Sequence, residues 1–217
     1  MYTKYNFDLK NAAKVDYSKD IIFIDCESTK PTFDKPKRYV IEAAAVKADG
    51  TILVNEVLKQ PEEYFRYYQN HKLNVGIHDE DIRNAKRTWH EVQKIIIELS
   101  RSNIVVAFNM NYERELFHNL LTSAFSASCC MERFSERYGK WNNYHSNHEY
   151  VGLSTAAEYF NIKFNGPQHR ALPDAEVTRQ IWLKLEQQGD EQEQQNKSNN
   201  ILDYSKTHKL KRYSING

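Results

Sequence analysis

Apolar residues along this chain gather in short runs that predict β-strands and in longer periodic segments that predict helices. Residues 20–27, DIIFIDCE, carry four consecutive apolar residues, mostly β-branched, that run into a polar end, as in a buried strand. Residues 38–59 predict two further strands around the turn Ala48-Asp49-Gly50, because Asp-Gly is a strong hairpin signal. Three consecutive strands are therefore expected to open the fold.

The rest of the chain alternates between helical and strand patterns. Residues 78–101 have a helical period, with Thr88 and Glu91 as a capping box ahead of an apolar stripe. Further strands are expected at 103–108 and 126–131, and further helices at 111–125, 153–162 and 171–188. Strands followed by alternating strands and helices predict an α/β fold, with a mixed five-stranded sheet flanked by helices.

Composition narrows the class of protein. A chain of 217 residues with 40% hydrophobic residues suits one globular domain. Its 30 Lys+Arg balance 29 Asp+Glu, so any phosphate-binding surface must be a local patch. We expect no membrane span, because no run approaches the roughly 18 apolar residues that a span requires. Three cysteines, two of them adjacent, form no disulfide framework, and we expect a cytoplasmic, reducing location.

The C-terminal region differs in composition from the rest. The segment QQGDEQEQQNKSNN has no apolar residue, so we expect a domain over 1–186 and a disordered linker and basic tail over 187–217. In the tail, apolar residues alternate with a basic group, Lys206, Lys209, Lys211 and Arg212. This tail either contacts phosphates, docks on a protein partner, or remains solvated. The sequence does not define the oligomeric state.

Two acidic residues close the first predicted strand. Asp25 and Glu27 are two residues apart, so their side chains point to the same face of the strand, while Cys26 points to the other. Two carboxylates side by side repel each other unless a cation lies between them. A solvated strand end is the alternative interpretation.

The segment VAFNMNYERELF, residues 106–117, carries two more acidic residues in a predicted helix. Glu113 shares a helix face with Leu116 and Phe117, whereas Glu115 aligns with polar neighbours and is expected to face water. An unpaired carboxylate buried on an apolar stripe costs several kcal/mol, so Glu113 requires a cation, a donor or a site.

A third group lies at QHRALPDAEV, residues 168–177. Pro173 suits the first turn of a helix, which places Asp174 in that turn and His169 just before it. Asp174 lies on the inward stripe of that helix, although an acidic residue near a helix N-terminus is also an ordinary cap.

These segments together supply four carboxylates and one histidine. Hard oxygen ligands favour Mg²⁺ or Mn²⁺ over zinc. Four acids around two such ions is the arrangement that assists phosphodiester hydrolysis, and a histidine beside them can take the proton from the attacking water.

The sequence resembles the DEDDh, or DnaQ-like, 3′–5′ exonucleases, which have a ribonuclease H-like fold. The family's Asp-x-Glu motif is present as IIFIDCEST, and its closing His-x-Ala-x-x-Asp-Ala motif is complete over 169–175. The second motif, usually His-Asn-x-x-Phe-Asp, corresponds to residues 108–113, where Phe108 replaces the His and Glu113 replaces the Asp. Lys30 stands where a Gly often follows the first motif.

The resemblance implies a role for each matching residue. Asp25, Glu27, Glu113 and Asp174 would hold two Mg²⁺ or Mn²⁺ ions, and His169 would be the general base. The product would be a nucleoside 5′-monophosphate released from a 3′ end. Ser28, Thr29 and Asn109 are weaker candidates for substrate contacts, with Asn109 orienting the second motif.

Other segments admit two interpretations each. His145 and His148 suggest a zinc site only weakly, because the spacing to Cys129 and Cys130 matches no zinc pattern. The same loop contains Trp141, Tyr144 and Tyr150, which suit either stacking on single-stranded bases or surface packing. Residues 64–72, YFRYYQNHK, are interpreted as a helix whose aromatic residues dock on the core.

The sequence as a whole predicts a metal-dependent 3′–5′ exonuclease acting on single-stranded nucleic acid, with DNA as the first choice. Two alternatives remain open: a catalytically silent module that binds a 3′ end in the same groove, and an exoribonuclease. The sequence does not separate DNA from RNA, because that choice depends on contacts to the sugar 2′ position.

Overall fold

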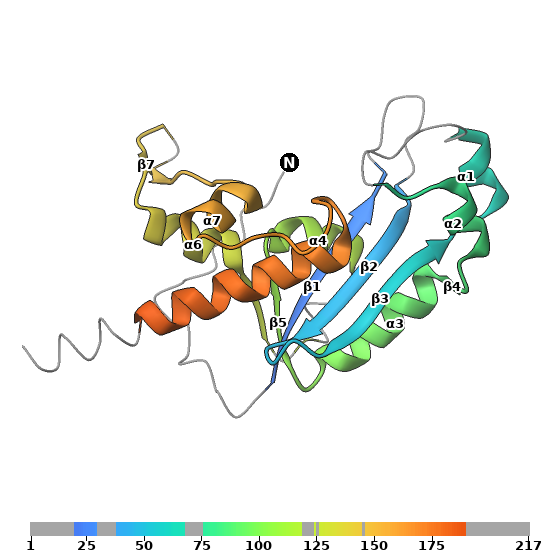
Figure 1. Ribbon diagram of the computed structural model, residues 1–217, viewed down its shortest axis with the longest axis horizontal. Helices are drawn as coiled ribbons and strands as arrows, with labels where there is room; N and C mark the ends of the chain where they lie inside the picture. Colours follow the sequence, from blue (N-terminus) through green and yellow to red (C-terminus); the bar gives the residue numbers. More distant parts are fainter. Residues whose placement is uncertain are drawn as a thin grey trace, which may run out of the picture.

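The computed structural model describes residues 20–29, 38–67, 76–118, 124, 126–144 and 146–189. Its centre is a six-stranded mixed sheet in the order β4-β3-β2-β1-β5-β6. Helices cover both faces of this sheet (Figure 1). The α/β prediction is confirmed, and the sheet has one strand more than predicted.

The sheet combines antiparallel and parallel pairs. Its strands are β1 (Ile21–Ser28), β2 (Val40–Lys47), β3 (Ile52–Lys59), β4 (Arg87–Thr88), β5 (Ile104–Ala107) and β6 (Ser126–Cys129). The first three pair antiparallel, whereas β5 runs parallel to β1 and β6 runs parallel to β5. Parallel strands end at one edge of a sheet, so the segments that follow β1, β5 and β6 begin near one another. Gly50 has a φ of 90° in the turn between β2 and β3, as the Asp-Gly signal predicts.

Side chains alternate along β1 between two hydrophobic clusters. Ile22, Ile24 and Cys26 pack into the cluster that contains Val92 and Ile96. On the other face, Ile21 and Phe23 pack into a second cluster, which contains Val177 and Ile181 of the C-terminal helix over 171–189. The pattern of period two therefore fixes which face of the strand carries its polar end.

Residues 78–101 form two helices separated by a strand, where one helix was predicted. They are α2 (Asp79–Asn84), β4 and α3 (Trp89–Ser100). Thr88 caps α3, and its backbone N–H donates to Glu91 Oε2 at 2.7 Å, so the expected capping box is present. The same box marks the start of a new helix, which is why the segment divides there and why β4 adds a sixth strand beside β3.

The remaining helices are α1 (Glu62–Tyr67), α4 (Met110–Leu116), α6 (Cys130–Tyr138), α7 (Leu153–Tyr159) and a helix over 171–189. Tyr64 and Phe65 of α1 are buried, as the docking interpretation predicts, while 68–75 lie outside the described residues. The predicted helix over 111–125 ends at Leu116 in the structure, and its residues 119–123 and 125 lie outside the described part.

Two features were not predicted. The strand expected over 126–131 ends at Cys129, and α6 begins immediately after it. A small hairpin follows, formed by β7 (Trp141–Asn142) and β8 (Asn147–His148). This hairpin projects from the body of the molecule beside α6 and α7 (Figure 1).

The predicted domain boundary after residue 186 falls inside the C-terminal helix, which continues to residue 189. Residues 190–217, with the basic group of the tail, lie outside the described residues. All three cysteines are free thiols, as expected. Among the described residues, none of the helices combines the length and the apolar composition that a membrane span requires.

Candidate active site

The polar end of β1 places two carboxylates on one face. Asp25 and Glu27 continue the row of Ile21 and Phe23, while Cys26 points into the opposite cluster, as predicted. Burial raises the pKa of Asp25 well above its usual value, and the nearby charges of Glu113, Glu27 and Asp174 raise it further. Asp25 therefore lies within a group of carboxylates that repel one another.

Glu113 is a buried carboxylate on α4. Asn109 caps this helix, and its side chain accepts a hydrogen bond from Tyr112 N. Glu113 is 2% exposed, and burial raises its pKa to about 8, against the opposing effect of hydrogen bonds with Cys26. Its Oε2 atom has no hydrogen-bond partner among the described residues. Glu115, by contrast, is exposed and pairs with Arg38 at 2.8 Å, so the predicted division between buried and exposed acids is confirmed.

The C-terminal helix carries the fourth acid. Pro173 lies in its first turn, as predicted, and Asp174 follows it and is 7% exposed. Burial raises the pKa of Asp174 to about 6, while the nearby His169 acts in the opposite direction. The Oδ1 atom of Asp174 is buried without a hydrogen-bond partner among the described residues. His169 is exposed and has a φ of 61°, a left-handed conformation that few non-glycine residues adopt.

Three of these side chains converge on one point. Glu27, His169 and Asp174 each offer a ligand atom, and these atoms all lie within 4.8 Å of one another. They come from β1 and from two positions around the start of the C-terminal helix, more than 140 residues later in the chain. The fold thus brings Glu27 together with His169 and Asp174, whereas Asp25 and Glu113 are not members of this group. Asp25 lies close enough for the charges of Glu113, Glu27 and Asp174 all to raise its pKa.

A comparison with protein families identifies the same chain segment. The family model that matches residues 22–182 is RNase_T, described as Exonuclease. This match spans most of the 217 residues and includes all three motifs. The chain belongs to this exonuclease family. Together with the fold, this assigns it to the DnaQ-like 3′–5′ exonucleases with a ribonuclease H-like fold, as the motifs predicted.

Solved structures with the same fold are distant in sequence from this exonuclease. Pop2p from S. pombe, in a form with bound Mg²⁺ and Mn²⁺, superposes with a TM-score of 0.55 and 12% identity over 76% of this chain and 82% of that one. E. coli exonuclease I in complex with a dT13 oligonucleotide superposes with a TM-score of 0.56 and 14% identity, over 88% of this chain and 44% of that one.

The exonuclease module of Saccharomyces cerevisiae Pan2, in complex with AAGGAA RNA, gives a TM-score of 0.58 and 11% identity over 88% of this chain and 32% of that one. The chain thus spans less than half the length of exonuclease I and about a third of the Pan2 module, which also contains a pseudoubiquitin hydrolase. No curated protein matches the sequence significantly.

The three candidate substrate residues of the exonuclease differ in accessibility. The hydroxyl of Ser28 lies 2.8 Å from the hydroxyl of Tyr112 at the end of β1. Thr29 is 2% exposed, and its Oγ1 atom accepts a hydrogen bond from Tyr39 N at 2.9 Å, which leaves a substrate little access to it. Asn109 is exposed and caps α4, and its role in orienting the second motif stays a prediction.

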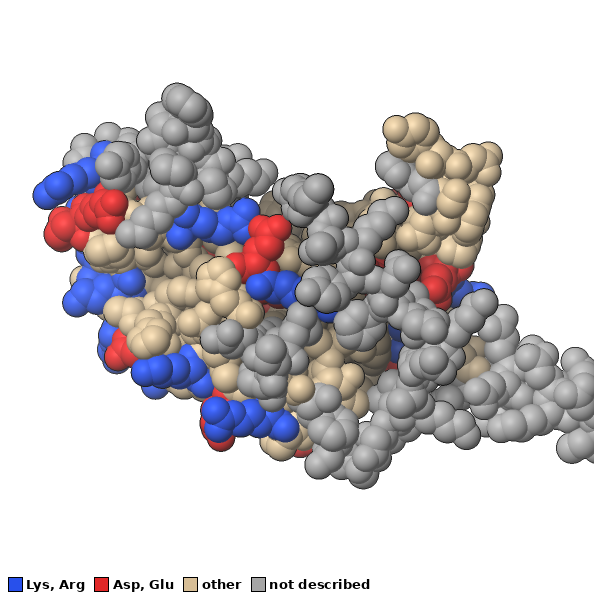
Figure 2. Space-filling view, turned by 180° about the vertical axis from the view of Figure 1, so that it is seen from behind, with Lys and Arg blue, Asp and Glu red and all other residues tan. Residues whose placement is uncertain are grey.

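The hairpin stands out from the surface of the exonuclease. Figure 2 shows it as a projection made mostly of uncharged side chains. Trp141 is 54% exposed, Tyr144 90% and Tyr150 49%. Ser154 Oγ lies 3.1 Å from Gln168 Oε1, so the chain that leaves the hairpin contacts the segment of His169. The zinc interpretation of this loop involves His145, which lies outside the described residues.

Sequence reasoning missed two residues that hydrogen-bond to the segments carrying the site residues. Tyr112 was read only as part of the second motif, and Glu42 only as part of a strand. Glu42 carried a signal, because it is the one charged residue in the apolar segment YVIEAAAV and is 1% exposed in the structure. A charge that deep in a strand requires a partner. That partner is Arg170, next to His169 in the chain.

Proposed function

We propose that this exonuclease hydrolyses single-stranded nucleic acid from its 3′ end, with two divalent ions held by Asp25, Glu27, Glu113 and Asp174. The observation that carries the proposal is the convergence of Glu27, His169 and Asp174 within 4.8 Å, next to two further buried or half-buried acids. Each reaction releases a nucleoside 5′-monophosphate.

The donor set fits Mg²⁺ or Mn²⁺. All four acids offer hard oxygen ligands, and Glu113 and Asp174 each have a buried carboxylate oxygen without a hydrogen-bond partner among the described residues. Bound cations would neutralise the repulsion within the group and stabilise charge on the attacking and leaving oxygens. The Mg²⁺ and Mn²⁺ form of Pop2p supports the choice of ion.

His169 is the proposed general base. It is exposed at the edge of the acid group, so its ring can reach a water molecule that approaches the last phosphodiester at the 3′ end of a bound strand. His169 takes one proton from this water as its oxygen forms a bond to phosphorus. The bond from phosphorus to the 3′ oxygen of the preceding nucleotide breaks, and this oxygen takes a proton from solvent to become the new 3′ hydroxyl. The neighbouring Asp174 and Glu27 carboxylates stabilise the imidazolium that results.

The second motif supports the same reaction with a longer side chain. Glu113 stands where the family usually has Asp, and it is buried and hydrogen-bonds with Cys26 near the end of β1. Met110 and Leu116 of α4 belong to the same hydrophobic cluster as Cys26, so α4 and β1 are packed together beside this carboxylate. We therefore propose that Glu113 takes the fourth carboxylate role.

Single-stranded DNA is the first substrate that we propose, and RNA is the alternative. Exonuclease I was solved with dT13 and Pan2 with AAGGAA RNA, so the shared fold accommodates both sugars. A single strand suits the site because the exposed aromatic side chains of the hairpin offer faces on which unpaired bases stack, and the chain that follows the hairpin contacts the segment of His169.

The test uses purified protein on 5′-labelled single strands of DNA and RNA of one sequence, with Mg²⁺, Mn²⁺ or EDTA. We expect a ladder that shortens from the 3′ end, is abolished by EDTA and is absent with Asp25→Ala. The faster of the two strands identifies the preferred sugar. Cleavage that survives EDTA would exclude the metal mechanism. Metal-dependent retention of the strand without cleavage would instead establish the silent binding module.

A further inference from the structure

Glu42 lies directly opposite Glu27 in the sheet. The two residues are paired across β1 and β2, next to a register shift at the end of β1. Like charges in directly opposite positions destabilise a sheet, and Glu42 is 1% exposed. The side chain of Glu42 therefore requires a cation that does not come from solvent.

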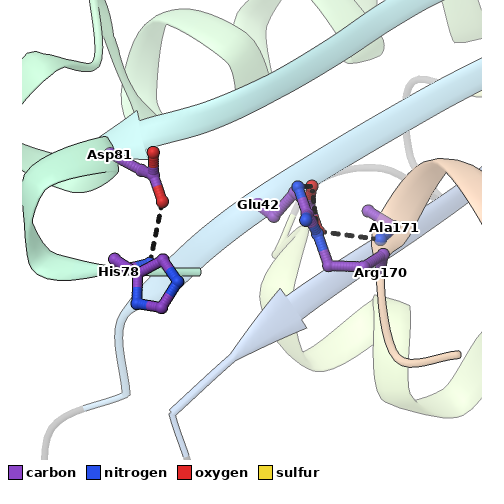
Figure 3. A network of polar contacts seen from close by, with 5 residues as sticks. All are labelled: Glu42, His78, Asp81, Arg170 and Ala171. Atoms are coloured by element: carbon purple, nitrogen blue, oxygen red, sulfur yellow. Dashed lines mark hydrogen bonds and ion pairs between the residues drawn. The ribbon is translucent and has the colours of Figure 1, made fainter. Parts of the chain in front are cut away.

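Arg170 supplies this cation and binds both carboxylate oxygens of Glu42. Its Nε atom lies 2.9 Å from Oε1 and 3.0 Å from Oε2, and its Nη2 atom lies 2.7 Å from Oε1. The backbone N–H of Ala171 donates to Oε2 at 2.9 Å. Figure 3 shows the guanidinium and this N–H meeting the carboxylate from one side. These charge-assisted bonds hold two segments that are 128 residues apart.

The segment that Glu42 binds, through Arg170 and Ala171, also carries His169 and Asp174. Ala171 begins the C-terminal helix, and Asp174 N donates to Arg170 O at 3.1 Å in its first turn. The Glu42 carboxylate thus caps a helix from a neighbouring strand, where the helix dipole favours negative charge. His169 immediately precedes Arg170 and has a φ of 61°, a conformation that surrounding contacts must hold.

We propose that Glu42 and Arg170 are positioning residues, whose ion pair fixes the backbone at 169–171 and thereby holds the His169 ring over the acid group. The guanidinium also offsets part of the negative charge that Glu42 places opposite Glu27. This inference rests on the proposed role of His169 as general base. Neither Glu42 nor Arg170 contacts the reacting atoms.

Activity measurements separate this role from simple stabilisation of the fold. Glu42→Gln retains an oxygen for Ala171 N–H and loses the ionic bond to Arg170. Because a displacement of about 1 Å at a reacting centre costs roughly 100-fold in rate, we expect kcat to fall by about 10- to 100-fold, with KM changed less than about threefold.

The arginine series provides a rescue. Arg170→Gln should lose as much as Glu42→Gln, and Arg170→Lys should recover part of kcat because it restores a charge without the planar fork. Since both residues act as one unit, the double variant Glu42→Gln/Arg170→Gln should lose little more than either single variant. Glu176→Gln is the matched control, because Glu176 pairs with Arg179 on the same helix and should leave kcat unchanged.

A second readout does not depend on turnover. The His169 ring resonances, identified by their loss in His169→Asn, are recorded by ¹H–¹³C NMR in each variant. We expect them to shift or broaden in Glu42→Gln and Arg170→Gln, while those of the exposed His90 on α3 stay in place.

Unchanged His169 resonances in Glu42→Gln and Arg170→Gln would overturn the inference. It would also be overturned if the loss of kcat in these variants followed their loss of stability and Arg170→Lys did not recover kcat. A wild-type protein that cleaves no strand would refute the proposed function, and the NMR result would still decide whether the pair positions His169.

Discussion

The hydroxyl groups of Ser28 and Tyr112 lie 2.8 Å apart and join the end of β1 to the first turn of α4. Asp25 and Glu27 precede the first of these residues, and Glu113 follows the second. The bond therefore connects the two elements that carry three of the four proposed metal ligands. Burial raises the pKa of Tyr112 to about 12, so the phenol keeps its proton at neutral pH and can donate to Ser28.

Tyr112→Phe removes this bond and retains the ring, with Arg38 still over its face. A net hydrogen bond of this kind is worth about 1 kcal/mol, so we expect the free energy of unfolding to fall by about that amount in urea titrations. Because α4 is then held less firmly, we also expect kcat to fall more than KM rises. Tyr159→Phe, at an exposed ring, is the control. Equal behaviour of the two variants would contradict a role for the Ser28 contact.

The buried acids predict how the stability of the metal-free protein depends on pH. Burial raises the pKa of Glu113 from 4.5 to about 8, so between these values the folded protein binds more protons than the unfolded chain. Stability then falls as pH rises through this window. Asp174, with a pKa raised from 3.8 to about 6, adds to the loss in the lower part of the window.

Thermal melts in EDTA at about pH 5.5 and about pH 8.5 measure this effect. We expect a lower Tm for the wild type at the higher pH, and a smaller drop for Glu113→Gln. Added Mg²⁺ should raise the wild-type Tm more at the higher pH, because binding requires ionised ligands. A wild-type Tm that rises with pH in EDTA, in parallel with Glu113→Gln, would show that Glu113 is ionised in the metal-free fold.

Glu113→Gln also separates stability from activity. The amide has nearly the same volume and no proton to lose, so the metal-free variant should be more stable than the wild type at neutral pH, where folding of the wild type requires the buried Glu113 to take up a proton. The exonuclease rate should fall by about 100-fold, as expected when a group at the reacting centre is misplaced. Glu115→Gln on the exposed face of α4 is the matched control, and full activity of Glu113→Gln would remove Glu113 from the proposed site.

The sequence predicted the acids of the site because local periodicity determines where they point. Residues two apart on a strand point to the same face, which predicted the arrangement of Asp25 and Glu27. The period of a helix likewise predicted that Glu113 is buried and Glu115 exposed. Each of these predictions concerns a single strand or helix. The distance between Glu27 and Asp174 depends instead on how two elements pack together, and the sequence indicated it only through the resemblance of the motifs to a family.

What the sequence did not reveal depends on contacts between distant elements. Glu42 was visible as a charge within an apolar strand, but its partner Arg170 lies 128 residues away and has no local signature. The division of residues 78–101 was missed for a different reason. Thr88 and Glu91 were recognised as a cap, yet the acidic turn before them, 79–84, continued the helical period and concealed the break.

The β7–β8 hairpin yields a prediction about the length of strand that the exonuclease holds. Trp141 and Tyr144 are 54% and 90% exposed, and Trp141 contacts His148 edge-on at a ring separation of 5.2 Å. If nucleotides upstream of the 3′ end stack on these rings, each lost contact costs about 1–3 kcal/mol of binding. For Trp141→Ala/Tyr144→Ala we therefore expect KM for a long single strand to rise at least about tenfold with kcat unchanged.

Two controls accompany this measurement. KM for a strand too short to reach the hairpin should stay constant. In Ile52→Ala, which removes another exposed apolar side chain, both kcat and KM should stay constant. An equal rise in KM for short and long strands would place the contact at the 3′ terminus itself, and no rise for either would leave the hairpin outside the path of the strand.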